Sequence, residues 1–288
     1  MHDLLIAPFA DYAFMRKALI GAIAVALGAA PIGAFLILRR MSLTGDAIAH
    51  GILPGAAVGY LLAGLSLTAM TLGGLVAGMA VALGAAAVSR RTAQREDASL
   101  AAFTLISLAA GVMLVSLRGS SLDLLHFLFG SVLALPDDAL VLLAAIATVT
   151  LLAFALLFRL FVTDALDPSF LRRVGPRTGL VHYAFLALAV LNLIAGFHAL
   201  GTLMAVGIMI LPAAAARFWT RSVGAVVVVA VVIAVLSCAT GLILAFHLDL
   251  QPSATMILCS GVAYVVSLLA GREGSVMARR RLPSGVPA

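Results

Sequence analysis

The run Val223-Gly-Ala-Val-Val-Val-Val-Ala-Val-Val-Ile-Ala-Val-Leu-Ser-Cys-Ala-Thr-Gly-Leu-Ile-Leu-Ala-Phe246 decides the fold class of this chain. Only Ser237, Cys238, Thr240 and small residues interrupt it. About 20 consecutive apolar residues cross a bilayer as a helix, whereas a membrane β-strand would alternate apolar and polar residues. The run therefore predicts a transmembrane helix.

The rest of the composition extends this prediction to the whole chain. Of its 288 residues 64% are hydrophobic and 10% are charged, against roughly 25% charged in soluble domains. Neither a soluble fold nor a disordered chain carries so much apolar surface. We expect an all-α, polytopic membrane protein of eight or nine spans. Nine are assigned to 18–38, 45–64, 68–89, 98–117, 138–160, 180–198, 200–216, 222–246 and 253–271. The stretch 119–136 is too short and interrupted for a clear span, and is either amphipathic or re-entrant.

The basic residues orient these spans. Of the 18 lysines and arginines, only Arg16, Lys17 and Arg118 fall on one side if every span crosses once. Cytoplasmic loops carry the excess of Lys and Arg, so the basic side and the C-terminus are expected in the cytoplasm. The net charge of +6 is explained as this topology signal rather than as a nucleic-acid surface. We expect one transmembrane domain over 1–271 and a basic tail over 272–288, which is either a lipid contact or a disordered end.

Two ionisable residues stand inside the second predicted span. Asp46 and His50 are four residues apart, so a helix places them on one face. Ionisable residues within a span are costly and are functional candidates, and a carboxylate with an imidazole suits Zn²⁺ or Mn²⁺. Two structural roles stay open: Asp46 as a helix N-cap and His50 as a buried hydrogen-bonded partner.

The residues that follow this pair predict how its helix packs. Gly51 and Gly55, with Gly59, form overlapping GxxxG patterns that allow close helix approach. Pro54 removes a backbone hydrogen bond and favours a kink.

Further polar residues, namely His126, His198, His247 and Asp249, fall at or near the predicted outer ends of helices. They are possible metal contacts at an outer mouth that attracts cations, or simply polar loop residues.

The sequence contains no nucleotide site of the usual kind. A Walker A loop needs Lys followed by Ser or Thr, and the only lysine, Lys17, is followed by Ala18. The chain is therefore expected to be no enzyme, to hold no permanent cofactor, and to take its energy from an ion gradient or a separate subunit.

The loop after the fifth span contains Asp167-Pro168, a helix-start pattern, and Gly175-Pro176, a helix stop. A short helix there displays Phe170, either to a partner protein or to the membrane interface.

Several segments together resemble the permease subunits of bacterial zinc and manganese ABC importers, the ZnuB-like family. They are Arg39-Arg-Met-Ser-Leu-Thr-Gly-Asp-Ala-Ile-Ala-His-Gly-Ile-Leu-Pro-Gly55, Arg95-Glu-Asp97, Asp123-Leu-Leu-His-Phe-Leu-Phe-Gly130, Asp167-Pro-Ser-Phe-Leu-Arg-Arg-Val-Gly175 and Leu200-Gly-Thr-Leu-Met, running to Leu211-Pro-Ala-Ala-Ala-Ala-Arg217. The matches run in order across most of the chain. Gly51 replaces the family's frequent Ala, and Ala215 replaces its usual Thr.

The resemblance implies a homodimeric or paired permease in the bacterial inner membrane. Two ATP-binding subunits would dock from the cytoplasm, and a soluble metal-binding protein would deliver Zn²⁺ or Mn²⁺ from outside. Asp46 and His50 look like the metal-coordinating pair. The segment with Asp167, Pro168, Phe170, Arg172 and Gly175 looks like the coupling segment to the ATPase, and Pro212, like Gly51, Pro54 and Gly55, looks like a hinge or packing residue.

Two rival functions stay open beside ATP-driven import of zinc, or next manganese. One is a proton-coupled secondary cation transporter that uses Asp46 and His50. The other is a related ABC permease for an iron chelate. An intramembrane enzyme lacks support, because the sequence contains neither HExxH nor GxSxG.

Overall fold

The fold is described from a computed structural model, in residues 7–64, 66–92, 95–117, 132–167, 170 and 179–280. Within these ranges the chain is helical and contains no strand, so the predicted all-α class is confirmed. The long helices are α3 (Ala13–Leu38), α4 (Thr44–Ala63), α5 (Leu67–Arg91), α6 (Glu96–Leu117), α8 (Asp137–Leu166), α10 (Gly179–Leu200), α11 (Thr202–Ala216), α12 (Val223–Leu248) and α13 (Pro252–Ala270). Short elements are α2 (Ala7–Asp11), η1 (Val132–Ala134) and α14 (Val276–Arg280).

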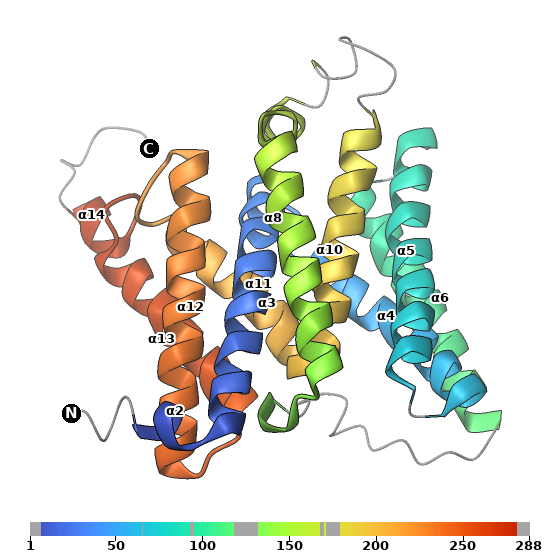
Figure 1. Cartoon of the computed structure of the whole chain (residues 1–288). Coiled ribbons are helices and arrows are strands. Elements are labelled where there is room, and N and C mark those ends of the chain that lie inside the picture. The colour runs from blue at the N-terminus through green and yellow to red at the C-terminus, as the bar shows by residue number, and fades with distance from the viewer. Residues whose placement is uncertain are drawn as a thin grey trace.

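Each of the nine predicted spans corresponds to one long helix. In the described ranges seven helices, all but α6 and α11, are long and apolar enough to cross a membrane. The helix α6 has the required length with 22 residues, whereas α11 is apolar but has only 15. The short α2 and α14 lie at opposite ends of the bundle, as an odd number of crossings requires (Figure 1).

Two predicted boundaries are wrong by several residues. The first span was expected to begin at residue 18, but α3 begins at Ala13. The fifth span was expected to end at residue 160, but α8 continues to Leu166. The extension is possible because Asp164, although buried, lies 2.7 Å from the guanidinium of Arg39. In the sequence a carboxylate indicates the end of a span. The sequence does not show that another helix supplies a cation that neutralises this carboxylate.

The helix α3 occupies the centre of the bundle, and it packs on α8, α10, α11 and α12 (Figure 1). Small residues let the backbones approach: a Cβ on Gly33 would overlap the carbonyl oxygen of Met209 on α11. On its other side Phe35 is fully buried and contacts four more phenylalanine rings at 5.4–6.2 Å between centroids. Pro212, a predicted packing residue, is buried one turn beyond Met209 in α11.

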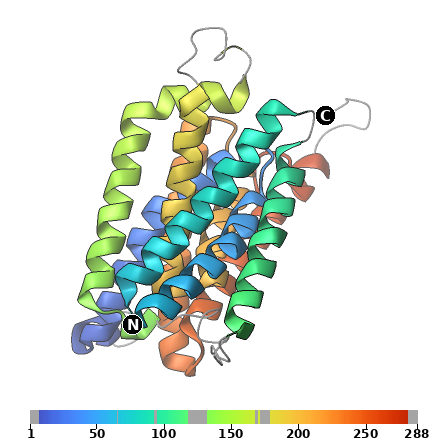
Figure 2. The same cartoon turned by 90° about the vertical axis from the view of Figure 1, so that its right-hand side faces the viewer.

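The helices α4, α5 and α6 lie side by side at one edge of the bundle (Figure 2). The predicted close approach is present between α4 and α5. A Cβ on Gly55 would stand 2.1 Å from the carbonyl oxygen of Gly73, and one on Gly59 would stand 2.3 Å from that of Ala69. A Cβ on Gly51 would meet the side chain of Val81 at 3.1 Å. The glycine stripe therefore fixes α4 by backbone contact, leaving its other face available.

Candidate functional site

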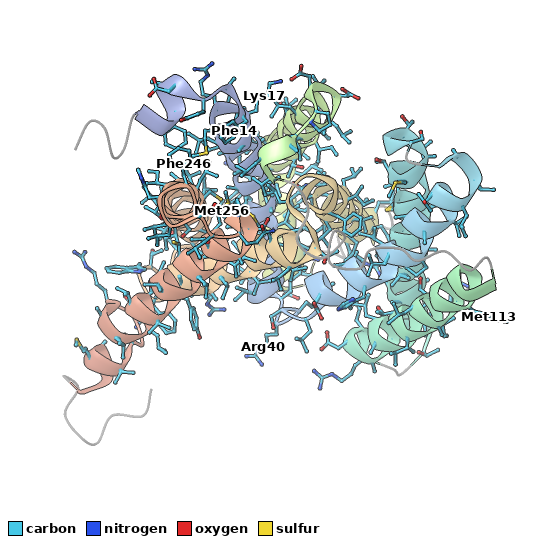
Figure 3. All side chains as sticks on the ribbon, turned by 90° about the horizontal axis from the view of Figure 1, so that it is seen from below. Phe14, Lys17, Arg40, Met113, Phe246 and Met256 are labelled. Atoms are coloured by element: carbon cyan, nitrogen blue, oxygen red, sulfur yellow. The ribbon has the colours of Figure 1, made fainter. Side chains whose placement is uncertain are left out.

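The pair Asp46 and His50 lies in the first two turns of α4, directly after a tight turn. The chain leaves α3 through Arg40, which has a positive φ of 59°, and the amide of Met41 donates to the carbonyl of Leu36 at 2.9 Å. Seen from below, Arg40 lies on the edge of the bundle opposite Lys17 (Figure 3). Because the turn is closed by backbone hydrogen bonds, the start of α4 is held in a defined position relative to the end of α3.

The two side chains lie together on an exposed face. Nε2 of His50 is 3.6 Å from Oδ1 of Asp46, and the side chains are 50% and 60% exposed respectively. The N-cap of α4 is Leu43, and Asp46 is the third residue of the helix. The structural roles considered for the pair therefore do not apply: Asp46 is not the N-cap, and His50 is not buried.

The pair by itself provides only two side chains of the kinds that bind metals. In the described ranges no third His, Cys, Asp or Glu joins it, or any other pair, to form a metal-binding group. Transition-metal sites usually hold at least three protein ligands. Pro54 lacks the N–H that would otherwise bond the His50 carbonyl within the helix. The exposed face thus offers a carboxylate and an imidazole to ligands that come from outside this chain.

Two hydroxyl groups of α6 support α4 beside the pair, and the sequence analysis did not identify them. Oγ1 of Thr104 donates to the carbonyl of Ala47 at 3.1 Å, and Oγ of Ser107 donates to that of Gly51 at 3.1 Å. The two carbonyls flank His50 along the helix. The three-residue spacing of Thr104 and Ser107 on an apolar helix is the signal that could have suggested a shared polar face.

Two of the residues predicted at an outer mouth, His247 and Asp249, lie at the end of α12 and not beside this pair. His247 and Asp249 are exposed at the end of α12, where His247 contacts the ring of Phe246 at 5.4 Å. Of His198 only the backbone, in the last turn of α10, is described. His126 lies outside the described residues. Their predicted role as metal contacts stays a prediction.

The start of the predicted coupling segment has the capping contact that its sequence indicates. The amide of Phe170 donates to Oδ1 of Asp167 at 2.9 Å, the bond by which an aspartate caps a helix. Phe170 is 55% exposed. Pro168, Arg172 and Gly175 lie outside the described residues.

The structure also contains a buried polar cluster at the helix ends that the sequence motifs did not predict. It joins Arg39 at the end of α3, Glu96 at the start of α6, Asp164 near the end of α8 and His182 near the start of α10; we call these residues the helix-end cluster. Arg39 lies 2.7 Å from Asp164 and 2.8 Å from Nδ1 of His182, whose Nε2 lies 2.9 Å from Glu96. Motif reading missed it because its members come from four separate parts of the chain.

The fold defines the class of protein as a polytopic, all-helical membrane protein. A family model, the ABC 3 transport family, matches residues 11–271. The chain therefore belongs to the ABC 3 transport family, whose members are the permeases of ATP-binding-cassette transporters and carry no ATPase site of their own. The chain is accordingly a multi-pass permease of the plasma membrane, and the resemblance seen in the sequence is confirmed.

Individual relatives cover nearly the whole chain. The "Manganese transport system membrane protein MntC" of Listeria monocytogenes is 30% identical over 94% of this chain and 96% of its own. The "Chelated iron transport system membrane protein YfeD" of Yersinia pestis is 29% identical over 98% and 94%. The solved structure "PsaBC from Streptococcus pneumoniae in complex with Fab" matches 98% of this chain and all of its own, with a TM-score of 0.83 and 26% identity.

Proposed function

We propose that this chain is the permease subunit of an importer that moves Mn²⁺ into the cytoplasm, powered by a separate ATP-hydrolysing subunit. The observation that carries the proposal is the exposed Asp46–His50 pair on a helix that is otherwise fixed by buried contacts. Ionisable residues on a membrane-spanning helix mark transport pathways. The choice of Mn²⁺ as the substrate is based on relatives that are named as manganese transport proteins.

The metal site of the proposal is shared between two copies of the chain. Asp46 and His50 of each copy face a common axis and provide two carboxylates and two imidazoles. That donor set suits a divalent transition metal. A site split between two subunits binds the ion when the subunits approach and weakens when they move apart, which transport requires because the ion must be released.

The other partners are proposed to bind at the two ends of the helix bundle. ATP-binding subunits dock at the loop that begins with Asp167, where exposed Phe170 offers an apolar contact. The excess of arginine at that end supports a cytoplasmic position for the loop, α14 and the C-terminus. A metal-binding protein outside the membrane delivers the ion to the opposite end, where His247 and Asp249 are exposed.

The choice of metal rests on the relatives. A carboxylate and an imidazole bind zinc as well as manganese, and zinc binds more tightly to most such sites, which is why the sequence alone favours zinc. The names of the relatives favour manganese. An iron-chelate substrate is the second candidate, because one relative of similar identity is named for it.

The test is the metal content of cells that lack this chain, measured by elemental analysis of manganese, zinc and iron under limitation of each. We expect a manganese deficit that the wild-type chain restores and that Asp46→Ala and His50→Ala do not restore at equal membrane levels. Asp138→Ala is the matched control, since it removes an exposed carboxylate at another helix start. A deficit confined to zinc or iron would reassign the substrate.

A second measurement separates the ATP-driven importer from the proton-coupled rival. Uptake of Mn²⁺ is followed in cells whose proton gradient has been collapsed while ATP is maintained. Continued uptake supports the importer. Loss of uptake, together with restoration by an imposed proton gradient without ATP, would replace the proposal with a secondary transporter.

A further inference from the structure

We infer that the helix-end cluster (Arg39, Glu96, Asp164 and His182) is the positioning device that carries the movement of the α8–α10 loop to the metal-binding face of α4. The inference rests on the proposed function, because it assumes that an ATPase moves this loop. It adds a role for four residues that neither the sequence motifs nor the comparisons assign.

The cluster holds both ends of the loop. Asp164 lies three residues before Asp167, the first residue of the loop, and His182 lies in the first turn of the helix that follows it. Both are about 90% buried in their side chains, and each is bonded to Arg39 rather than to its own helix. Any displacement of the loop therefore acts directly on the guanidinium of Arg39.

The hydrogen bonds of the cluster form one directed chain. A guanidinium has only donors, so Nη1 of Arg39 donates to Nδ1 of His182, which must be unprotonated. The proton of the imidazole then sits on Nε2 and is donated to Oε1 of Glu96 at 2.9 Å. Arg39 neutralises Asp164, while its guanidinium lies 4.2 Å above the ring of Phe185. His182 joins Arg39 to Glu96 through its two ring nitrogens, and Arg39 is ion-paired with Asp164, so in this proposal the four side chains shift together.

Two routes lead from the cluster to the metal pair. The first is covalent: Arg39 opens the hydrogen-bonded turn that enters α4, seven residues before Asp46. The second runs through α6, which begins at Glu96 and whose Thr104 and Ser107 bond the α4 carbonyls on either side of His50. The two routes meet at the same two turns of α4, so a shift of the cluster changes the direction of the Asp46–His50 face.

Its position distinguishes this cluster from an ordinary buried ion pair. Other buried polar contacts, such as that of Asn192 with Thr150 at 2.7 Å, join α8 and α10 in the middle of the bundle. They touch neither the loop nor the turn into α4. The helix-end cluster, by contrast, lies between the loop and the turn into α4 and contacts the segments beside both.

The experiment measures Mn²⁺ transported per ATP hydrolysed, with the permease and its ATPase reconstituted together in vesicles. We expect His182→Phe and Asp164→Asn to lower this ratio about tenfold, a usual size for coupling between sites, while ATP hydrolysis and Mn²⁺ binding are retained. His182→Gln should keep the ratio, because its amide oxygen accepts from Arg39 and its amide nitrogen donates to Glu96. Thr150→Val, the matched control, should leave the ratio unchanged.

The outcomes separate the inference from the function on which it rests. If the wild-type complex transports no Mn²⁺ with ATP, the proposed function fails. If it transports Mn²⁺ and His182→Phe keeps the wild-type ratio, the coupling role is overturned. Equal losses in His182→Phe, His182→Gln and Thr150→Val would also overturn it, because they would reflect bundle stability. Should Asp164→Asn not reach the membrane, the comparison of His182→Phe with His182→Gln decides by itself.

Discussion

The two groups of charged residues in this permease differ in how their charges are satisfied. Asp46 and His50 are at least half exposed and 3.6 Å apart on one helix. Arg39 and Asp164 have side chains less than one-tenth exposed and lie 2.7 Å apart on two helices. The side chains of the exposed pair are accessible to a ligand, whereas the buried residues neutralise one another's charge.

The difference teaches how a membrane protein places charge for two purposes. Buried charges persist only when they are paired and hydrogen-bonded, and removing one partner is costly because the other stays buried. An exposed pair contributes little to folding, and its polar atoms stay accessible to a ligand. We therefore expect mutations in the two groups to separate stability from transport.

The largest expected effect on stability comes from Arg39→Met. The substitution leaves Asp164 buried without its cation, which costs about 3–5 kcal/mol, whereas Asp46→Ala changes the free energy of unfolding by less than about 0.5 kcal/mol. Unfolding in detergent is measured by labelling of the buried thiol of Cys238 in a background with Cys259→Ala. Adding Asp164→Leu to Arg39→Met should recover most of the loss, because both charges are then gone.

A smaller effect is expected where α4 meets α5. In Gly55→Ala the new Cβ would stand 2.1 Å from the carbonyl oxygen of Gly73, so the helices must separate, at a cost of about 1–3 kcal/mol. Gly261→Ala is the matched control, because nothing lies within 4 Å of a Cβ at that helical position. It should stabilise by up to about 1 kcal/mol through helix propensity. Equal stability of the two variants would contradict the close approach of α4 and α5.

The smallest effect is expected at the hydroxyls of α6. Thr104→Val removes the bond to the Ala47 carbonyl, worth about 0.6 kcal/mol for interhelical hydrogen bonds in membranes, and lowers the affinity for Mn²⁺ a few-fold by loosening α4. Thr148→Val removes a hydroxyl that bonds within its own helix and should leave Mn²⁺ affinity unchanged. Identical affinities in both variants would show that α6 does not position the pair.

Much of the fold could be predicted from local patterns. Each apolar run became a helix, because a span must satisfy its own backbone hydrogen bonds. The spacing of Gly51, Gly55 and Gly59 indicated a close contact, and α5 provides it. The aspartate cap at Asp167 was also readable, because its partner lies three residues away. The end of α8 was misplaced, since it depends on a charge from α3.

The sequence by itself determined the helical spans, the shared face of Asp46 and His50, and the family to which the chain belongs. These properties depend on periodicity and on residues close together in the chain. Only the tertiary structure decided that this pair is exposed rather than buried, that α6 braces it, and that Arg39, Glu96, Asp164 and His182 form one cluster. Such contacts join segments that are distant in sequence, and no local pattern specifies which helices become neighbours.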